Sequence, residues 1–129
     1  MNHTIAESKE FCSHSADMIK LAAEKGIDIG VAPSYLSLQT VKENAGNMIV
    51  AAQDCHFADH GAYTGFVSIP MIKELGIDWC LVGHSERRLY AAETSLTCNR
   101  KIKALIENKM TVVYCVGAVS YTHLRAHET

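Results

Sequence analysis

The sequence lacks an apolar run of about 18 residues, so it predicts no membrane-spanning helix. Its first residues do not combine a basic segment with an apolar one, so no secretory signal is expected. The formal net charge is only −2, which gives no electrostatic footprint for nucleic acid. The glycine motifs of dinucleotide-binding folds and of P-loops are also missing. We therefore expect no membrane, no nucleic acid and no nucleotide cofactor.

Paired cysteine motifs are absent as well. The five cysteines are widely spread and include no Cys-x-x-Cys, so neither a disulfide framework nor a zinc ribbon is expected. Cys80 and Cys115 lie inside apolar runs, where cysteine behaves as a small hydrophobic residue. His56 and His60, near Cys55, have a spacing that could hold zinc on a helix, but the segment is typical of a loop and we expect no metal. This cysteine usage fits a reducing cytoplasm.

The composition is that of an ordinary globular protein. Of the 129 residues, 48% are apolar and 20% are charged, which excludes a disordered chain and is enough for one domain with a core. Four apolar runs alternate with helical patterns. Strands are expected at residues 27–32, 48–52, 78–83 and 111–117, and helices at residues 4–25, 36–45 and 68–75, with a further helix after residues 93–95.

This alternation predicts an α/β fold whose parallel strands are joined by right-handed crossovers. It allows an open doubly wound sheet, complete at four strands, or part of a (β/α)₈ barrel. In both folds the functional site lies at the carboxyl ends of the strands. Thr4 and Glu7 form a capping-box pattern, and Ser68 is placed to cap the helix that contains Pro70. The expected core positions of three helices are Phe11, Met18, Leu21 and Ala22, then Met71, Ile72 and Leu75, then Ile102, Leu105 and Ile106.

His84 follows a buried strand directly and precedes a charged helical turn. The partial positive charge of a helix N-terminus disfavours an imidazolium, so a neutral imidazole could donate a hydrogen bond to a substrate oxygen. A structural histidine that ties down the loop is the alternative. Ser85 is expected as the N-cap rather than as a nucleophile, because the second glycine of a nucleophile elbow is missing. Glu86 with the following arginines is either a supporting network or a solvated face.

Several motifs in register resemble the triosephosphate isomerase family. They are Val31-Ala32-Pro33-Ser34-Tyr35, Val50-Ala51-Ala52-Gln53-Asp54, Gly61-Ala62-Tyr63-Thr64-Gly65, Gly83-His84-Ser85-Glu86-Arg87-Arg88 and Tyr114-Cys115-Val116-Gly117. The Gly-His-Ser-Glu-Arg-Arg run after an apolar strand is highly specific. The resemblance covers about residues 1–117.

The resemblance implies a partial (β/α)₈ TIM barrel of about four strands. It also implies a cytoplasmic enzyme of glycolysis and gluconeogenesis that interconverts dihydroxyacetone phosphate and D-glyceraldehyde 3-phosphate without a cofactor. The family is a standard example of a neutral histidine electrophile that works with a glutamate base. By resemblance, His84 is the electrophile, Ser85 and Glu86 belong to its supporting network, and Cys115 is a buried cysteine near the site.

The long loop Cys55–Gly65 has almost no apolar periodicity, which is typical of a functional or partner-binding loop. By resemblance, its residues Tyr63, Thr64 and Gly65 insert into a neighbouring subunit of a homodimer. The alternative function is a non-catalytic α/β protein-interaction module that uses this loop.

The resemblance also implies differences from the family. The chain corresponds to an N-terminal half, truncated at both ends, without the substrate-binding lysine, the glutamate base and the phosphate-binding lid, so the chain alone is expected to be inactive. Phe66 replaces a usual glutamate, so Arg87 is expected to lack its ionic partner. Residues 118–129 are expected to be a tail unrelated to the family.

Overall fold

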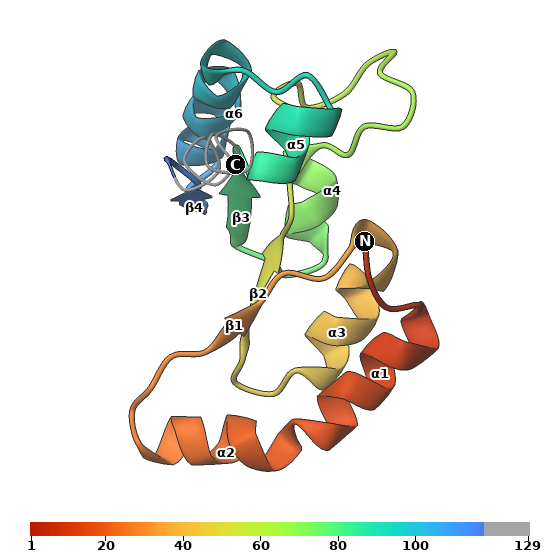
Figure 1. Cartoon of the computed structure of the whole chain (residues 1–129), viewed down its shortest axis with the longest axis vertical. Helices are drawn as coiled ribbons and strands as arrows, with labels where there is room; N and C mark the ends of the chain where they lie inside the picture. Colours follow the sequence, from red (N-terminus) through yellow and green to blue (C-terminus); the bar gives the residue numbers. More distant parts are fainter. Residues whose placement is uncertain (118–129) are drawn as a thin grey trace, which may run out of the picture.

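The computed structural model describes residues 1–117 as a four-stranded parallel sheet with helices between the strands (Figure 1). The strands are β1 (Gly30–Val31), β2 (Ile49–Ala52), β3 (Trp79–Val82) and β4 (Thr111–Tyr114). The helices are α1 (Ile5–His14), α2 (Ala16–Glu24), the 3₁₀ turn η1 (Tyr35–Ser37), α3 (Leu38–Asn44), α4 (Ile69–Glu74), α5 (Ser85–Tyr90) and α6 (Ser95–Glu107). The tail expected at residues 118–129 lies outside the described residues.

The sheet order is β1-β2-β3-β4, so each strand is added on the same side as the one before. An open doubly wound sheet reverses its strand order at a switch point, and the described sheet shows no such reversal. Consecutive addition is the arrangement of a barrel wall, which confirms the partial TIM-barrel α/β fold. The parallel register brings Ala52 beside Cys80 and Val82 beside Tyr114, so the strands end along one edge.

Local signals in the sequence account for most helix starts. The Thr4 hydroxyl accepts a hydrogen bond from the Glu7 N–H at 3.2 Å, while the Glu7 carboxylate accepts one from the Thr4 N–H at 3.0 Å. The Ser68 hydroxyl accepts a weaker bond from the Met71 N–H at 3.4 Å. Both predicted caps are therefore confirmed, and Pro70 lies in the first turn of α4.

The single long helix expected over residues 4–25 is wrong. The helix divides at Ser15, whose ψ of −2° departs from helical geometry, and α1 and α2 run in different directions in Figure 1. The bend lets α1 pack against α3. The strand expected at residues 27–32 is also shorter than predicted, because only Gly30 and Val31 pair with β2. Within residues 1–117, no helix combines the length and the hydropathy that a membrane span needs.

The predicted helix faces are only partly buried. Met18, Leu21, Met71 and Ile106 are each more than half exposed, whereas Ala22, Ile72 and Leu105 are buried as expected. Phe11, Leu75 and Ile102 are half-buried at the border of the core. The buried face of α6 instead runs through Cys98, Lys101 and Leu105, spaced three and four residues apart. Apolar periodicity missed it because one of its three positions is a lysine.

Candidate active site

His84 lies at the carboxyl end of β3 and is itself the N-cap of α5. Its Nδ1 accepts a hydrogen bond from the Glu86 N–H at 3.2 Å, and its carbonyl oxygen accepts bonds from the N–H groups of Arg87 and Arg88. The expectation that Ser85 caps this helix is therefore wrong. The imidazole replaces the serine hydroxyl because a ring nitrogen can satisfy one of the free N–H groups of the first turn.

The cap fixes the tautomer of the neutral His84 ring. Because Nδ1 accepts the Glu86 N–H, its lone pair is in use and the ring proton is on Nε2. The Ser85 hydroxyl, 3.3 Å from Nδ1, can only donate to the same atom. The Glu86 carboxylate is 3.8 Å from Nδ1, but its side chain is 73% exposed, so water screens its charge. His84 is thus a hydrogen-bond donor through Nε2.

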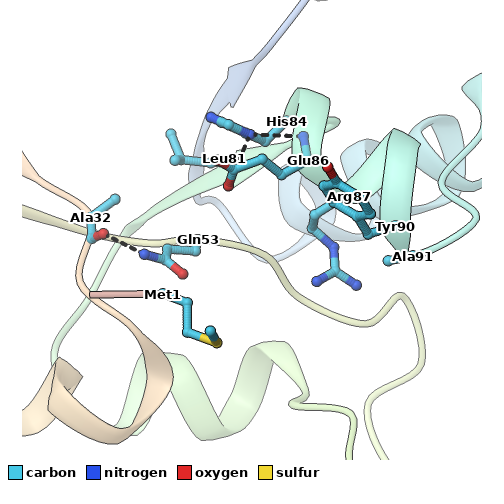
Figure 2. A pocket seen from close by; sticks show the side chains of 9 residues that line it. All are labelled: Met1, Ala32, Gln53, Leu81, His84, Glu86, Arg87, Tyr90 and Ala91. Atoms are coloured by element: carbon cyan, nitrogen blue, oxygen red, sulfur yellow. Dashed lines mark hydrogen bonds and ion pairs between the residues drawn. The ribbon is translucent and has the colours of Figure 1, made fainter. Parts of the chain in front are cut away.

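A cavity of about 500 Å³ lies beside His84 at the carboxyl ends of the strands (Figure 2). The residues that line it are Met1, Ala32, Gln53, Leu81, His84, Glu86, Arg87, Tyr90 and Ala91. The Gln53 amide donates to the Ala32 carbonyl at 2.8 Å, which ties the end of β2 to the end of β1. The cavity volume is within the usual range for a small-molecule site.

A buried charged network surrounds Arg87, one of the residues that line this cavity. The Lys101 ammonium donates to Asp54 at 2.9 Å and to Glu93 at 2.7 Å, and these three residues are at most 7% exposed. The Thr97 hydroxyl donates a further hydrogen bond to Glu93. Neither Lys101 nor Glu93 was predicted from the sequence as a site residue. Lysine on an otherwise apolar helix face, at i+3 from Cys98, is the signal that could have indicated it.

The network favours the charged forms of Glu93 and Lys101. Burial by itself raises the pKa of Glu93, but the hydrogen bonds from Lys101 and Thr97 and the charges of Lys101 and Arg87 outweigh it, and the net pKa is lowered. Burial by itself lowers the pKa of Lys101, but its bonds to Glu93 and Asp54 reverse the direction and raise it. Asp54, Glu93, Lys101 and Arg87 therefore form one ionic network, and Arg87 is its member that lines the cavity.

Arg87 belongs both to this network and to the lining of the cavity, contrary to the expectation that it lacks an ionic partner. Its Nε lies 2.9 Å from Asp54 Oδ2 and 3.7 Å from Glu93 Oε2, as an ion pair without a well-aligned hydrogen bond. Asp54, at the end of β2, is thus the ionic partner of Arg87, which was expected to need a glutamate at position 66. Cys115 was expected to be buried and is only half-buried, because its neighbours on β4 are at the edge of the described sheet.

The loop after β2 projects beyond the sheet and carries Tyr63, Thr64 and Gly65, all exposed and distant along the chain from His84 (Figure 1). It is closed at its base by a hydrogen bond of 2.8 Å from the His56 N–H to the Val67 carbonyl. The His56 ring stacks on Phe66, with centroids 4.7 Å apart, and contacts Tyr63 at 4.2 Å. Phe66 thus holds the loop by aromatic stacking on His56, where a glutamate at this position was expected to hold it by an ion pair.

His56 and His60 do not converge on a common site. His56 is 8% exposed, and its Nε2 has no hydrogen-bond partner among the described residues. His60 has a side chain that is 90% exposed and contacts Asp59. The pKa of His56 is lowered by burial first and by the Lys101 charge second, against the opposing effect of Asp54. His56 therefore holds the loop as a neutral ring.

We expect acid to weaken this loop anchor. Because the folded pKa of His56 is below the unfolded value of about 6.5, the two states bind protons alike above that value. As the pH falls below about 6.5, His56 becomes protonated in the unfolded chain but stays neutral in the folded chain, so the free energy of unfolding decreases. The free energy of unfolding, measured in urea between about pH 7.5 and 5.5, should fall less in His56→Phe than in the wild type.

His60→Gln is the matched control, because it removes a histidine from the same loop at an exposed position. It should keep the wild-type pH dependence. An identical pH dependence in His56→Phe and the wild type would contradict the assignment of His56 as a buried neutral anchor.

The structure therefore brings His84, Ser85, Glu86, Gln53 and Arg87 to one edge of the sheet, as the strand-end positions of Gln53, His84 and Ser85 predicted. It leaves Tyr63, Thr64 and Gly65 on a separate projecting loop.

Comparison with known proteins gives one consistent result. The family model for triosephosphate isomerase matches residues 1–128. Curated triosephosphate isomerases from Alkaliphilus metalliredigens and Clostridium acetobutylicum are each 39% identical over 119 residues, which cover 91% of this chain and 47% of each relative. The enzyme from Mycoplasma capricolum is 46% identical over 91 residues, 70% of this chain and 37% of that protein. The chain thus spans about half the length of the curated relatives it matches.

Proposed function

The chain belongs to the triosephosphate isomerase family, and we propose that it supplies the carbonyl-polarising part of a site that interconverts dihydroxyacetone phosphate and D-glyceraldehyde 3-phosphate. The observation that carries the proposal is the capped His84 imidazole, whose Nδ1 accepts the Glu86 N–H and thereby leaves Nε2 as the donor of a ring that lines a cavity of substrate size. We further propose that the intact protein acts in glycolysis and gluconeogenesis, in the cytoplasm and without a cofactor.

The isomerisation moves a proton between two adjacent carbon atoms, and negative charge develops on the substrate oxygen as the first proton leaves. A donor fixed before the reaction stabilises that charge without reorganisation. On this proposal, the Nε2–H of His84 is that donor. Ser85 and the Glu86 backbone N–H support it by holding Nδ1 from the other side of the ring.

A proton transfer of this kind also needs a base on the carbon. Among the described residues that line the cavity, Glu86 is the only carboxylate, and it lies 3.8 Å from the histidine it would have to work with. Arg87 is engaged with Asp54 and Glu93, so it is not free to hold a phosphate. We propose that the base and the phosphate-binding groups are supplied from outside the described residues, and that the chain alone has almost no turnover.

Two coupled isomerase assays test the proposal. The purified chain should show no turnover above background. A chimera, in which this chain replaces the aligned region of the Clostridium acetobutylicum enzyme, should be active, because it restores the missing groups around His84. An inactive but folded chimera would refute the proposed function. Turnover by the chain alone, near that of the relative, would refute the assignment of the base to other residues.

We also propose that the loop with Tyr63, Thr64 and Gly65 contacts a second copy of the protein. Support comes from the exposure of residues 61–66 and from the aromatic stack that gives the projecting loop a fixed shape. Sedimentation of the chimera should show a dimer that Thr64→Arg weakens. A dimer of unchanged affinity in Thr64→Arg would contradict this contact.

A further inference from the structure

We infer that Tyr114 is a positioning residue for His84, acting through Arg88 and the carbonyl group of Gly83. The inference rests on the proposed role of His84 and adds a contact from β4 to it. Tyr114 does not line the cavity, and it lies 30 residues after His84 in the chain.

A continuous chain of hydrogen bonds joins β4 to the turn before His84. The Arg88 guanidinium donates through Nη2 to the Tyr114 hydroxyl at 3.1 Å and through Nε to the Gly83 carbonyl at 3.0 Å. The Arg88 guanidinium also lies over the Tyr114 ring, 5.9 Å from its centroid. Gly83 immediately precedes His84, so this carbonyl belongs to the peptide unit that carries the His84 N–H.

The other bonds of His84 do not replace this link. The hydrogen bonds to its carbonyl and to Nδ1 come from α5 itself and hold the helix to the histidine. The ladder between β3 and β4 reaches the Val82 carbonyl, which accepts from the Cys115 N–H at 2.9 Å. Between that point and α5, the described hydrogen bonds hold the turn to a neighbouring strand only through Arg88 and Tyr114.

The turn is also enclosed by the same side chains. Gly83 has a φ of +77°, and a Cβ atom there would lie 2.9 Å from Tyr114 Cε1, 3.0 Å from Cys98 Sγ and 3.1 Å from Arg88 Nη2. The tyrosine ring therefore lies directly against the Gly83 backbone, while its hydroxyl fixes the arginine. A residue of this shape at position 114 sets both the path of the turn and the direction in which the carbonyl points.

Tyr114→Phe tests the inference, because it removes the hydroxyl and keeps the ring. We expect two local changes in the NMR spectra of the chain: the Gly83 carbonyl carbon shifts, and the Glu86 amide exchanges about two- to tenfold faster, as for one ordinary hydrogen bond weakened. Tyr63→Phe is the matched control, since it removes a hydroxyl from the projecting loop. It should change neither signal.

Arg88→Lys provides a second variant, because it keeps the charge but loses the planar fork that spans Gly83 and Tyr114. Arg88→Lys should cause the same shift at Gly83 and the same faster exchange at Glu86. The double variant with Tyr114→Phe should show no additional change in either signal. Unchanged signals in Tyr114→Phe would overturn the inference. Faster exchange spread evenly over the chain would also overturn it, because the tyrosine would then contribute only to general stability.

These readouts do not depend on isomerase turnover. An inactive chimera with the predicted NMR changes would refute the proposed function and leave the link from Tyr114 to His84 intact. An active chimera with unchanged NMR signals in Tyr114→Phe would support the proposed function and overturn the link from Tyr114 to His84.

Discussion

Lys101→Met is expected to lower the free energy of unfolding by about 3 kcal/mol, the low end of the range for breaking a buried ion pair. The variant leaves Asp54 and Glu93, which are 3% and 7% exposed, without their shared ammonium group. Neither carboxylate can regain its water shell in the folded chain. Arg87 stays near both carboxylates, which limits the loss of stability.

The expected loss is large because Lys101 connects separate parts of the fold. Asp54 follows β2, Glu93 precedes α6, and Lys101 lies in the middle of α6. The network therefore contributes to the docking of α6 on the end of β2, as well as to the local charge balance. Methionine fills a similar volume but offers no donor, so the two carboxylates repel each other at close range.

Lys103→Met is the matched control, because it makes the same chemical change two residues away at an exposed position of α6. It should change stability by less than about 0.5 kcal/mol. Urea unfolding followed by circular dichroism measures both variants. Equal stabilities for Lys101→Met and Lys103→Met would contradict the buried network.

His84→Gln in the active chimera is expected to lower kcat by about 10²–10³-fold, the effect of removing one donor that stabilises a developing oxyanion. Glutamine keeps a polar group of similar reach. It lacks the rigid ring of His84, in which one nitrogen accepts the Glu86 N–H while the other remains a donor on the opposite side. Since the lost bond strengthens as charge develops on the oxygen, KM should change far less than kcat.

His14→Gln provides the control for this kinetic prediction. His14 is exposed in the last turn of α1 and lies outside the cavity, so kcat should be unchanged within about twofold. A His84→Gln chimera with a raised KM and an unchanged kcat would show that His84 binds the substrate without stabilising the transition state.

The place of the site could be predicted from the sequence because it follows from strand order. Apolar runs followed by Gln53 and by Gly83-His84 predicted parallel strands whose carboxyl ends meet, and the structure places Gln53 and His84 at one cavity. The Thr4 and Ser68 caps were equally readable, because each depends on residues three positions apart. A cap of this kind can be predicted from the sequence because it depends only on residues in the same turn.

The charged network could not be predicted in the same way. Asp54 and Lys101 are 47 residues apart, and lysine on a helix is by default a solvated side chain. Only the tertiary packing of α6 turns that face inward. The N-cap of α5 was missed for a related reason: Ser85 is the better capping residue by preference, but the turn at Gly83 places the His84 ring over the free N–H groups.

The tautomer of His84 tests the central claim most directly. A long-range ¹H–¹⁵N spectrum of the imidazole rings, assigned by comparison with His84→Gln, distinguishes a protonated from an unprotonated ring nitrogen. At a pH where the ring is neutral, we predict an unprotonated Nδ1, which accepts the Glu86 N–H, and a protonated Nε2, which is the donor of the ring that lines the cavity. A proton on Nδ1 would break the cap, remove the donor and contradict the account.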